Sequence, residues 1–226
     1  MRTVQSSASS CNASDIESNV SDLVVEDILQ VATREFAAYG LAGSRIEKIQ
    51  QQTRTSKRMI YYHFGSKEGL YRAVIERAFE LAREVDKNFD PEAGSPEQAL
   101  KRITNNAFEA FIKNPHFVRL LSFENLAGAP FIRESKHASR LNRLAMADLE
   151  SVLKRGQANG SIRLDIKPLD VYINMVGLCF YHVAHHAGYL AAGFGSKESV
   201  NINSNTFHQT RKKAIEDTCW RYVKAG

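Results

Sequence analysis

The stretch that decides the fold is Ser56-Lys57-Arg58-Met59-Ile60-Tyr61-Tyr62-His63-Phe64-Gly65-Ser66-Lys67-Glu68-Gly69-Leu70. Ser56 can cap a short helix that Gly65 ends, and Ser66 can cap a longer helix after it. Ile60 and Phe64 are four residues apart and can anchor the short helix to a domain. The side chains left to face outward are Lys57, Arg58, Tyr61 and Tyr62. This pattern predicts a short, exposed, cationic helix.

Two helices are expected before this stretch. From Val24, apolar residues recur every three or four positions on one face, and Gly40 follows where a glycine cap belongs. That face is Val25, Ile28, Leu29, Ala32, Phe36 and Ala37. Ser44-Arg45-Ile46-Glu47 then has the form of a capping box that opens a helix over residues 45–52. With a turn over 53–56, the second and third helices form a helix-turn-helix, in which one helix braces another in the major groove of DNA.

Charge is concentrated in the same region. Residues 45–72 hold seven Lys and Arg against two Glu, an excess of five that equals the net charge of +5 of the whole chain. The remaining residues therefore sum to about zero, and the basic excess is a local footprint for phosphate.

The rest of the chain predicts more helices. Ser95-Pro96-Glu97-Gln98 is a strong helix start, Pro115 restarts a helix, and Pro168 can begin another. Further helices are expected over 66–81, 131–155 with an end at Gly156 or Gly160, 169–186 and 207–223. The fold class is all-α, with about nine helices in two groups. The predicted domains are a disordered tail at 1–20, a helix-turn-helix domain at 21–67 and a larger helical bundle at 68–226.

Several other classes of protein are disfavoured. Cys11, Cys179 and Cys219 are far apart and odd in number, which favours reduced thiols in a cytoplasm over disulfides or a zinc knuckle. The N-terminus has no apolar segment of the secretory kind. Residues 171–196 lack Asp, Glu, Lys and Arg, yet their histidines and glycines favour a buried or dimer-facing helix over a membrane span. No G-x-S-x-G, glycine-rich phosphate loop or H-E-x-x-H is present, so neither an enzyme nor a cofactor is expected.

The stretch from Ser56 to Leu70 resembles the recognition segment of TetR-family repressors, and the similarity extends over about residues 24–75. The two tyrosines followed by His, Phe and then Ser-Lys-Glu make this resemblance fairly specific. It implies a cytoplasmic, ligand-responsive regulator that acts as a homodimer through its last two helices and binds a palindromic operator in double-stranded DNA. Repression is the default, and activation stays open. The alternatives are a helical enzyme and an adaptor that binds only protein.

The resemblance also assigns roles to residues. Lys57 and Arg58 would reach base edges, and Tyr61 would contact a thymine methyl or a phosphate. The complete set of expected DNA-binding residues is Ser44, Arg45, Thr55, Ser56, Lys57, Arg58, Tyr61, Tyr62, His63 and Lys67. Three positions depart from the family's usual residues: Gln50 stands for Ala, Arg54 for a turn Gly, and Arg58 for a frequent Gly. Arg54 would be strained by about 1 kcal/mol if the turn required a positive φ.

An effector cavity is implied inside the second group of helices, apolar with a few polar groups. Its candidate residues are Phe108, Phe111, Phe117, Leu120, Phe123, Glu124, Tyr172, Met175, Cys179 and His182. His182, His185 and His186 also allow other interpretations. They favour a core or dimer-interface role, ahead of a polar contact in the cavity and of a metal site, and no metal is expected.

Overall fold

The regular structure is helical throughout the part of the chain that the computed structural model describes, which is residues 13–185, 188 and 204–226. These residues form ten α-helices and one short 3-10 turn, so the all-α prediction is confirmed. The chain divides into two compact units, Met1–Val74 and Ile75–Gly226.

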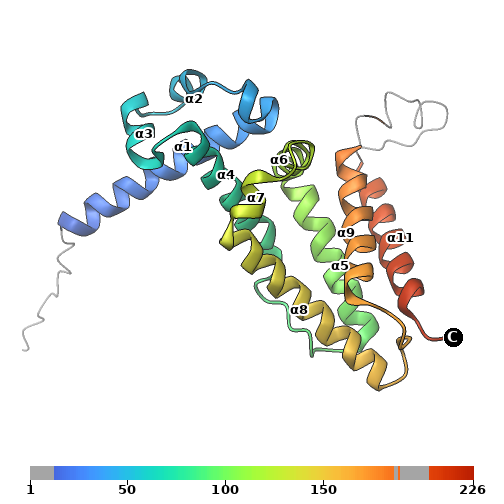
Figure 1. Cartoon of the computed structure of the whole chain (residues 1–226). Helices are drawn as coiled ribbons and strands as arrows, with labels where there is room; N and C mark the ends of the chain where they lie inside the picture. Colours follow the sequence, from blue (N-terminus) through green and yellow to red (C-terminus); the bar gives the residue numbers. More distant parts are fainter. Residues whose placement is uncertain (1–12, 186–187, 189–203) are drawn as a thin grey trace, which may run out of the picture. The chain divides into compact units, whose positions relative to one another are not determined.

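The first unit is built from α1 (Ala13–Gly43), α2 (Ile46–Gln52), α3 (Lys57–Phe64) and the first half of α4 (Lys67–Arg83) (Figure 1). The backbone leaves the helical conformation at Gly40 (φ 66°, ψ −179°), where the sequence predicts a break. The predicted face of α1 is buried from Ile28 to Ala37, and the Phe36 ring meets the Tyr71 ring of α4 edge-on at 5.0 Å. This apolar contact ties the start of α4 to the first unit.

The helix starts around the quoted stretch follow the prediction, with one exception. The Ser56 hydroxyl accepts from the Met59 N–H at 3.3 Å, and the Ser66 hydroxyl accepts from the Gly69 N–H at 3.0 Å. The expected capping box at Ser44 is wrong. Ser44 is buried, and its hydroxyl donates to the Gly40 carbonyl at 2.6 Å, because the end of α1 leaves carbonyl groups without helical partners.

Two predicted boundaries also differ from the structure. Helix α1 begins at Ala13, so residues 13–20 are not part of a disordered tail, and residues 1–12 lie outside the described residues. In the sequence, Ile16 and Val20 extend the three- and four-residue spacing backward among the Ser, Asn and Asp. The division of the chain falls after Val74 rather than after Lys67, because the first turns of α4 pack within the first unit.

The second unit contains the rest of α4, the 3-10 turn η1 (Glu84–Asp86) and six further helices. They are α5 (Pro96–Lys113), α6 (Pro115–Leu126), α7 (Pro130–Glu134), α8 (Lys136–Ala158), α9 (Pro168–Ala184) and α11 (Asn205–Val223). Helix α5 is central and packs against α8, α9 and α11 (Figure 1). It begins in the predicted capping box. The Ser95 hydroxyl accepts from the Gln98 N–H at 3.2 Å, and the Gln98 side-chain oxygen accepts from the Ser95 N–H at 3.0 Å.

The helix predicted over 131–155 is two helices, because Ser135 ends α7 and caps α8 by accepting from the Ala138 N–H at 3.1 Å. Helix α8 ends at Ala158, and Gly160 takes the positive φ of 75°. The segment from Gly156 to Pro168, which connects α8 to α9, is bonded to the end of α11, since the Arg163 N–H donates to the Val223 carbonyl at 3.0 Å. Within the described residues, none of the helices has the length and apolarity that a membrane crossing needs.

Candidate nucleic-acid interface and ligand cavity

Helix α3 packs against the rest of the first unit on one side and is exposed to solvent on the other. Its anchor is Ile60, whose side chain is fully buried, while Phe64 is half-buried. On the opposite side Lys57 and Arg58 are exposed, and Tyr62 is 77% exposed. A short helix with basic and aromatic side chains facing solvent has the form needed to enter a groove of DNA.

The turn before α3 is closed by residues that the sequence marks as unusual. The Gln50 side chain donates to the Thr55 carbonyl at 3.3 Å, and the Arg54 N–H donates to the Asp27 carboxylate of α1 at 3.2 Å. Arg54 does not take a positive φ, so the strain considered for this position is absent. The turn therefore has a shape that does not need glycine.

Lys57 is paired across the helix-turn-helix with Glu47, an interaction that sequence analysis missed. Its ammonium donates to the Glu47 carboxylate and lies 5.9 Å from the centre of the Tyr61 ring. This hydrogen bond lowers the pKa of Glu47 and raises the pKa of Lys57, so it favours the charged form of each group. Glu47 stands ten residues before Lys57, and only the geometry of the turn brings them together.

The expected DNA-binding residues differ in accessibility. Exposed side chains belong to Arg45, Ser56, Lys57, Arg58, Tyr61 and Tyr62, and half-buried ones to Thr55, His63 and Lys67. The expectation that Ser44 contacts DNA is not supported. Its side chain is 2% exposed and its hydroxyl also lies 3.2 Å from the Glu35 carbonyl, so it does not face the surface that α3 presents.

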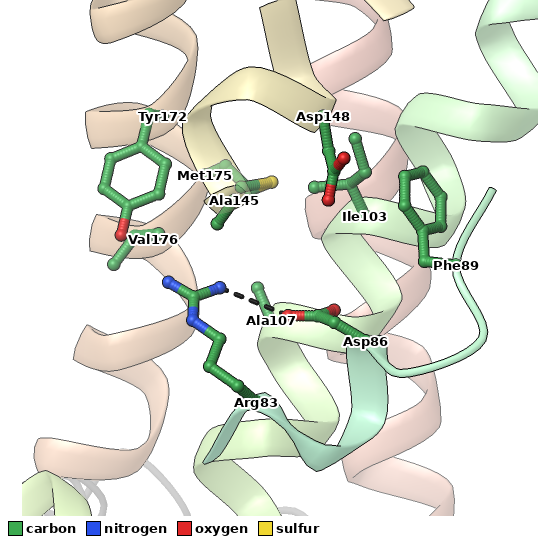
Figure 2. Close-up of a pocket in the computed structure, with 10 residues that line it drawn as sticks. All are labelled: Arg83, Asp86, Phe89, Ile103, Ala107, Ala145, Asp148, Tyr172, Met175 and Val176. Atoms are coloured by element: carbon green, nitrogen blue, oxygen red, sulfur yellow. Dashed lines mark hydrogen bonds and ion pairs between the residues drawn. The ribbon is translucent and has the colours of Figure 1, made fainter. Parts of the chain in front are cut away.

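A second candidate site is a cavity of about 250 Å³ in the second unit. Helices α4, α5, α6, α8 and α9 contribute to its wall, together with η1 and α7. Three of the candidate cavity residues, Phe111, Phe117 and Tyr172, line it. Met175 instead lines a smaller adjoining cavity of about 30 Å³, shown in Figure 2.

The other six expected cavity residues are elsewhere: Phe108, Leu120, Phe123, Glu124, Cys179 and His182 line neither of these cavities. Glu124 is buried because it caps α7, accepting from the Phe131 and Ile132 N–H groups at 3.0 and 3.1 Å. Leu120 is fully buried in the core. Whether it faces the core or the cavity depends on how α6 is rotated about its axis, which could not be predicted from the sequence.

His182, for which the sequence favours a core or dimer-interface role, is buried within the chain. Its ring stacks on Phe108 at 5.2 Å, and its Nε2 lies 3.0 Å from Nδ1 of His208 on α11. Cys179 is fully buried beneath it, and burial raises the pKa of its thiol. His186 lies outside the described residues.

The polar side of the cavity was not predicted from the sequence. The Arg83 guanidinium donates to Asp86 at 3.2 Å and to Asn142 at 3.1 Å, and Asn106 donates to the other oxygen of Asp86 at 3.1 Å. Asp148 lies in the adjoining small cavity with Arg83 and Asp86 (Figure 2). One available signal was Asn106, an amide next to Ala107 on the helix whose Ile103, Phe108 and Phe111 were expected to face inward.

Comparison with known families decides the class of protein. The family model described as "Bacterial regulatory proteins, tetR family" matches residues 28–74. The model described as "Tetracyclin repressor-like, C-terminal domain" matches residues 96–215, more than half of the 226 residues. The chain belongs to the TetR family. The TetR N-terminal match ends at Val74, where the structure divides.

Individual TetR-family relatives agree over most of the chain. The transcriptional repressor NicS of Pseudomonas putida is 30% identical over 187 residues, covering 81% of this chain and 88% of that protein. The regulator RutR of Escherichia coli K12 is 30% identical over 191 residues, covering 84% of this chain and 87% of that protein. These TetR-family relatives are transcriptional regulators, which decides against a helical enzyme or an adaptor that binds only protein.

Solved structures share the TetR fold. A TetR regulator from Chloroflexus aurantiacus matches with a TM-score of 0.69 at 18% identity, covering 92% of this chain and 100% of that one. FadR of Bacillus subtilis, in complex with stearoyl-CoA, matches with a TM-score of 0.60 at 12% identity, covering 86% and 96%.

Proposed function

We propose that this TetR-family chain is a repressor that binds its operator through α3 and leaves it when a small molecule occupies the second unit. The observation that supports DNA binding most directly is the geometry of α3, with Ile60 buried and the Lys57, Arg58 and Tyr62 side chains open to solvent. NicS, a repressor by name, favours repression over activation. A protein with this target acts where the chromosome lies, in the cytoplasm.

The proposed contacts follow from these positions. Lys57 and Arg58 stand in the first turn of α3 and reach base edges, and Tyr61 contacts a thymine methyl or a phosphate. The residues proposed to contact phosphates are Arg45, Thr55, Ser56, Tyr62, His63 and Lys67. Phosphate contacts fix the register of the protein on DNA, while the base contacts give sequence preference.

We propose a homodimer formed by α9 and α11. Helix α9 exposes Leu169, Ile173 and Tyr181 at four- and eight-residue spacing, with 50–57% of each side chain accessible. Gly177 completes the same row, and a Cβ added there would meet nothing within 4 Å. Such an apolar row favours burial against a second copy. A two-fold dimer would read a palindromic operator with half-sites about one helical turn apart.

Ligand control is proposed to act through α4. This helix is continuous from Lys67 to Arg83, and its last turns contribute Phe79 and Arg83 to the cavity. Leu70 and Tyr71, earlier in the same helix, are buried in the first unit. A ligand that binds one conformation of α4 better than another would shift the population of DNA-competent dimers.

Fluorescence anisotropy with duplexes from the region upstream of the gene tests DNA binding. Lys57→Ala/Arg58→Ala should weaken binding at least about tenfold and reduce its dependence on salt. Lys136→Ala/Arg140→Ala removes the same charge from exposed positions on α8 and should leave binding unchanged. Equal loss in both double variants, or in neither, contradicts the assignment to α3.

A further inference from the structure

Two adjoining cavities of the second unit differ in character, and Arg83, Asp86 and Asp148 also line a third cavity beside them. The larger, of about 250 Å³, is walled mainly by apolar side chains that include Phe79, Phe111 and Phe117. The smaller, of about 30 Å³, has room for one or two water-sized groups and contains three charged side chains, Arg83, Asp86 and Asp148. Both cavities have Arg83, Asp86 and Tyr172 in their walls, so they lie next to each other.

The hydrogen bonds leave one of these three charges without a partner. Arg83 is engaged by Asp86 at 3.2 Å and by Asn142 at 3.1 Å, and Asp86 also accepts from Asn106. Among the described residues, Asp148 has neither a hydrogen-bond partner nor an ion-pair partner. Figure 2 shows the charged ends of all three side chains turned toward the same space.

The sign of the local charge favours a cationic ligand. Two carboxylates face one guanidinium, so an anionic ligand would add a third negative charge to a partly buried site. Lys87, near Asp148 in a neighbouring cavity, is bound to Glu84 at 3.3 Å. The Tyr172 ring also lines the small cavity, and aromatic rings attract cations. The Phe89 ring lines it too, but the Arg102 guanidinium already lies over that ring at 5.3 Å and is engaged by the Asp90 and Ala93 carbonyls. Burial and the Asp86 carboxylate raise the pKa of Asp148, which agrees with a local excess of negative charge.

We infer that the effector, whose site rests on the proposed function, is an organic amine with a single ammonium group and a compact apolar body. The ammonium group occupies the small cavity between Asp148 and Asp86, and the apolar body lies against Phe111 and Phe117 in the larger cavity. The matched probes are 2-phenylethylammonium, 3-phenylpropionate and 2-phenylethanol, which share a phenyl body and differ in charge.

Isothermal titration calorimetry on the full-length protein without DNA tests the inference. The ammonium probe should bind at least about tenfold more tightly than the acid or the alcohol. Asp148→Asn should remove this preference, while Asp165→Asn, which changes the same charge at a 74% exposed position, should keep it. Thermal unfolding of each variant confirms that it is folded.

Tighter binding of the acid, equal binding of all three probes, or an unchanged preference in Asp148→Asn overturns the inference. If none of the probes binds while operator binding persists, the amine class fails and DNA binding by α3 stands. If the amine binds as expected but leaves the operator complex intact, the ligand class stands and the proposed release mechanism fails.

Discussion

Lys57 is proposed to contact DNA, yet in the free chain its ammonium already pairs with Glu47 on the preceding helix. We expect DNA binding to break this pair and to bring the Glu47 carboxylate near phosphates. Glu47→Gln should therefore raise operator affinity by about two- to fivefold, since exposed ion pairs contribute little. The gain should shrink with added salt, and anisotropy titrations at two salt concentrations measure it.

The control for that variant is Glu84→Gln, which removes the same charge from another exposed Glu–Lys pair in the second unit. It should leave operator affinity unchanged. A loss of affinity in Glu47→Gln would mean that the pair orients Lys57 for DNA instead of competing with it.

Asp148 should make stability depend on pH. Its pKa in the folded protein is raised above the ordinary value of 3.8 by burial and by Asp86, with Arg83 opposing them. The folded state therefore holds the proton more tightly, and this contribution to stability is lost as pH rises from 3.8 through the raised pKa. The amide introduced by Asp148→Asn does not titrate, so the stability of this variant relative to wild type should increase as pH rises from 3.8 through the raised pKa, and urea unfolding over that interval measures the difference. A difference that does not change with pH contradicts this assignment.

At the scale of elements, the start of α4 depends on a close approach. A Cβ added at Gly69 would lie 2.0 Å from the Phe64 carbonyl oxygen, so the backbone between α3 and α4 would have to shift. Gly69→Ala should destabilise the protein by about 1–3 kcal/mol and weaken operator binding. Urea unfolding followed by circular dichroism measures the first effect, and a midpoint equal to that of wild type would show that the turn relaxes freely.

The helices that sequence predicted well are those with local start and stop signals. Ser56, Ser95 and Pro168 begin helices because caps and prolines act within a few residues. Two other serines were not predicted correctly: Ser135 was passed over inside the helix expected at 131–155, and Ser44 was expected to cap α2. Each hydroxyl has several local partners, and tertiary packing selects among them: Ser135 stops a helix and bonds Glu76 at 2.8 Å, while Ser44 turns back to α1.

At the scale of the molecule, the two sites differ in how far sequence could predict them. The α3 surface comes from one continuous stretch, so a single motif places Lys57, Arg58 and Tyr61 together. The cavity is assembled from several helices, and whether a side chain lines it depends on each helix's rotation. Phe111 and Tyr172 were candidates because the family resemblance implied a cavity in this bundle, but Arg83 and Asp148 are 65 positions apart in sequence and meet only after packing.

The dimer proposal makes a prediction for the whole assembly. Leu169 is 57% exposed on the apolar row of α9. A two-fold interface on this row would bury one copy of Leu169 from each protomer. Leu169→Asp should weaken dimerisation by about 2 kcal/mol or more, roughly thirtyfold, because it places a carboxylate in an apolar contact. Sedimentation velocity at low concentration should then show monomer, with operator binding reduced in proportion.

Leu126→Asp is the matched control, since Leu126 ends α6 and is 87% exposed. It makes the same chemical change on a more accessible leucine and should leave both the dimer and operator affinity as in wild type. If Leu126→Asp dissociates the dimer while Leu169→Asp does not, the interface includes the end of α6 and not α9. The spacing between the two copies of α3 would then be set by a different pair of surfaces, and the operator half-sites would need a different separation.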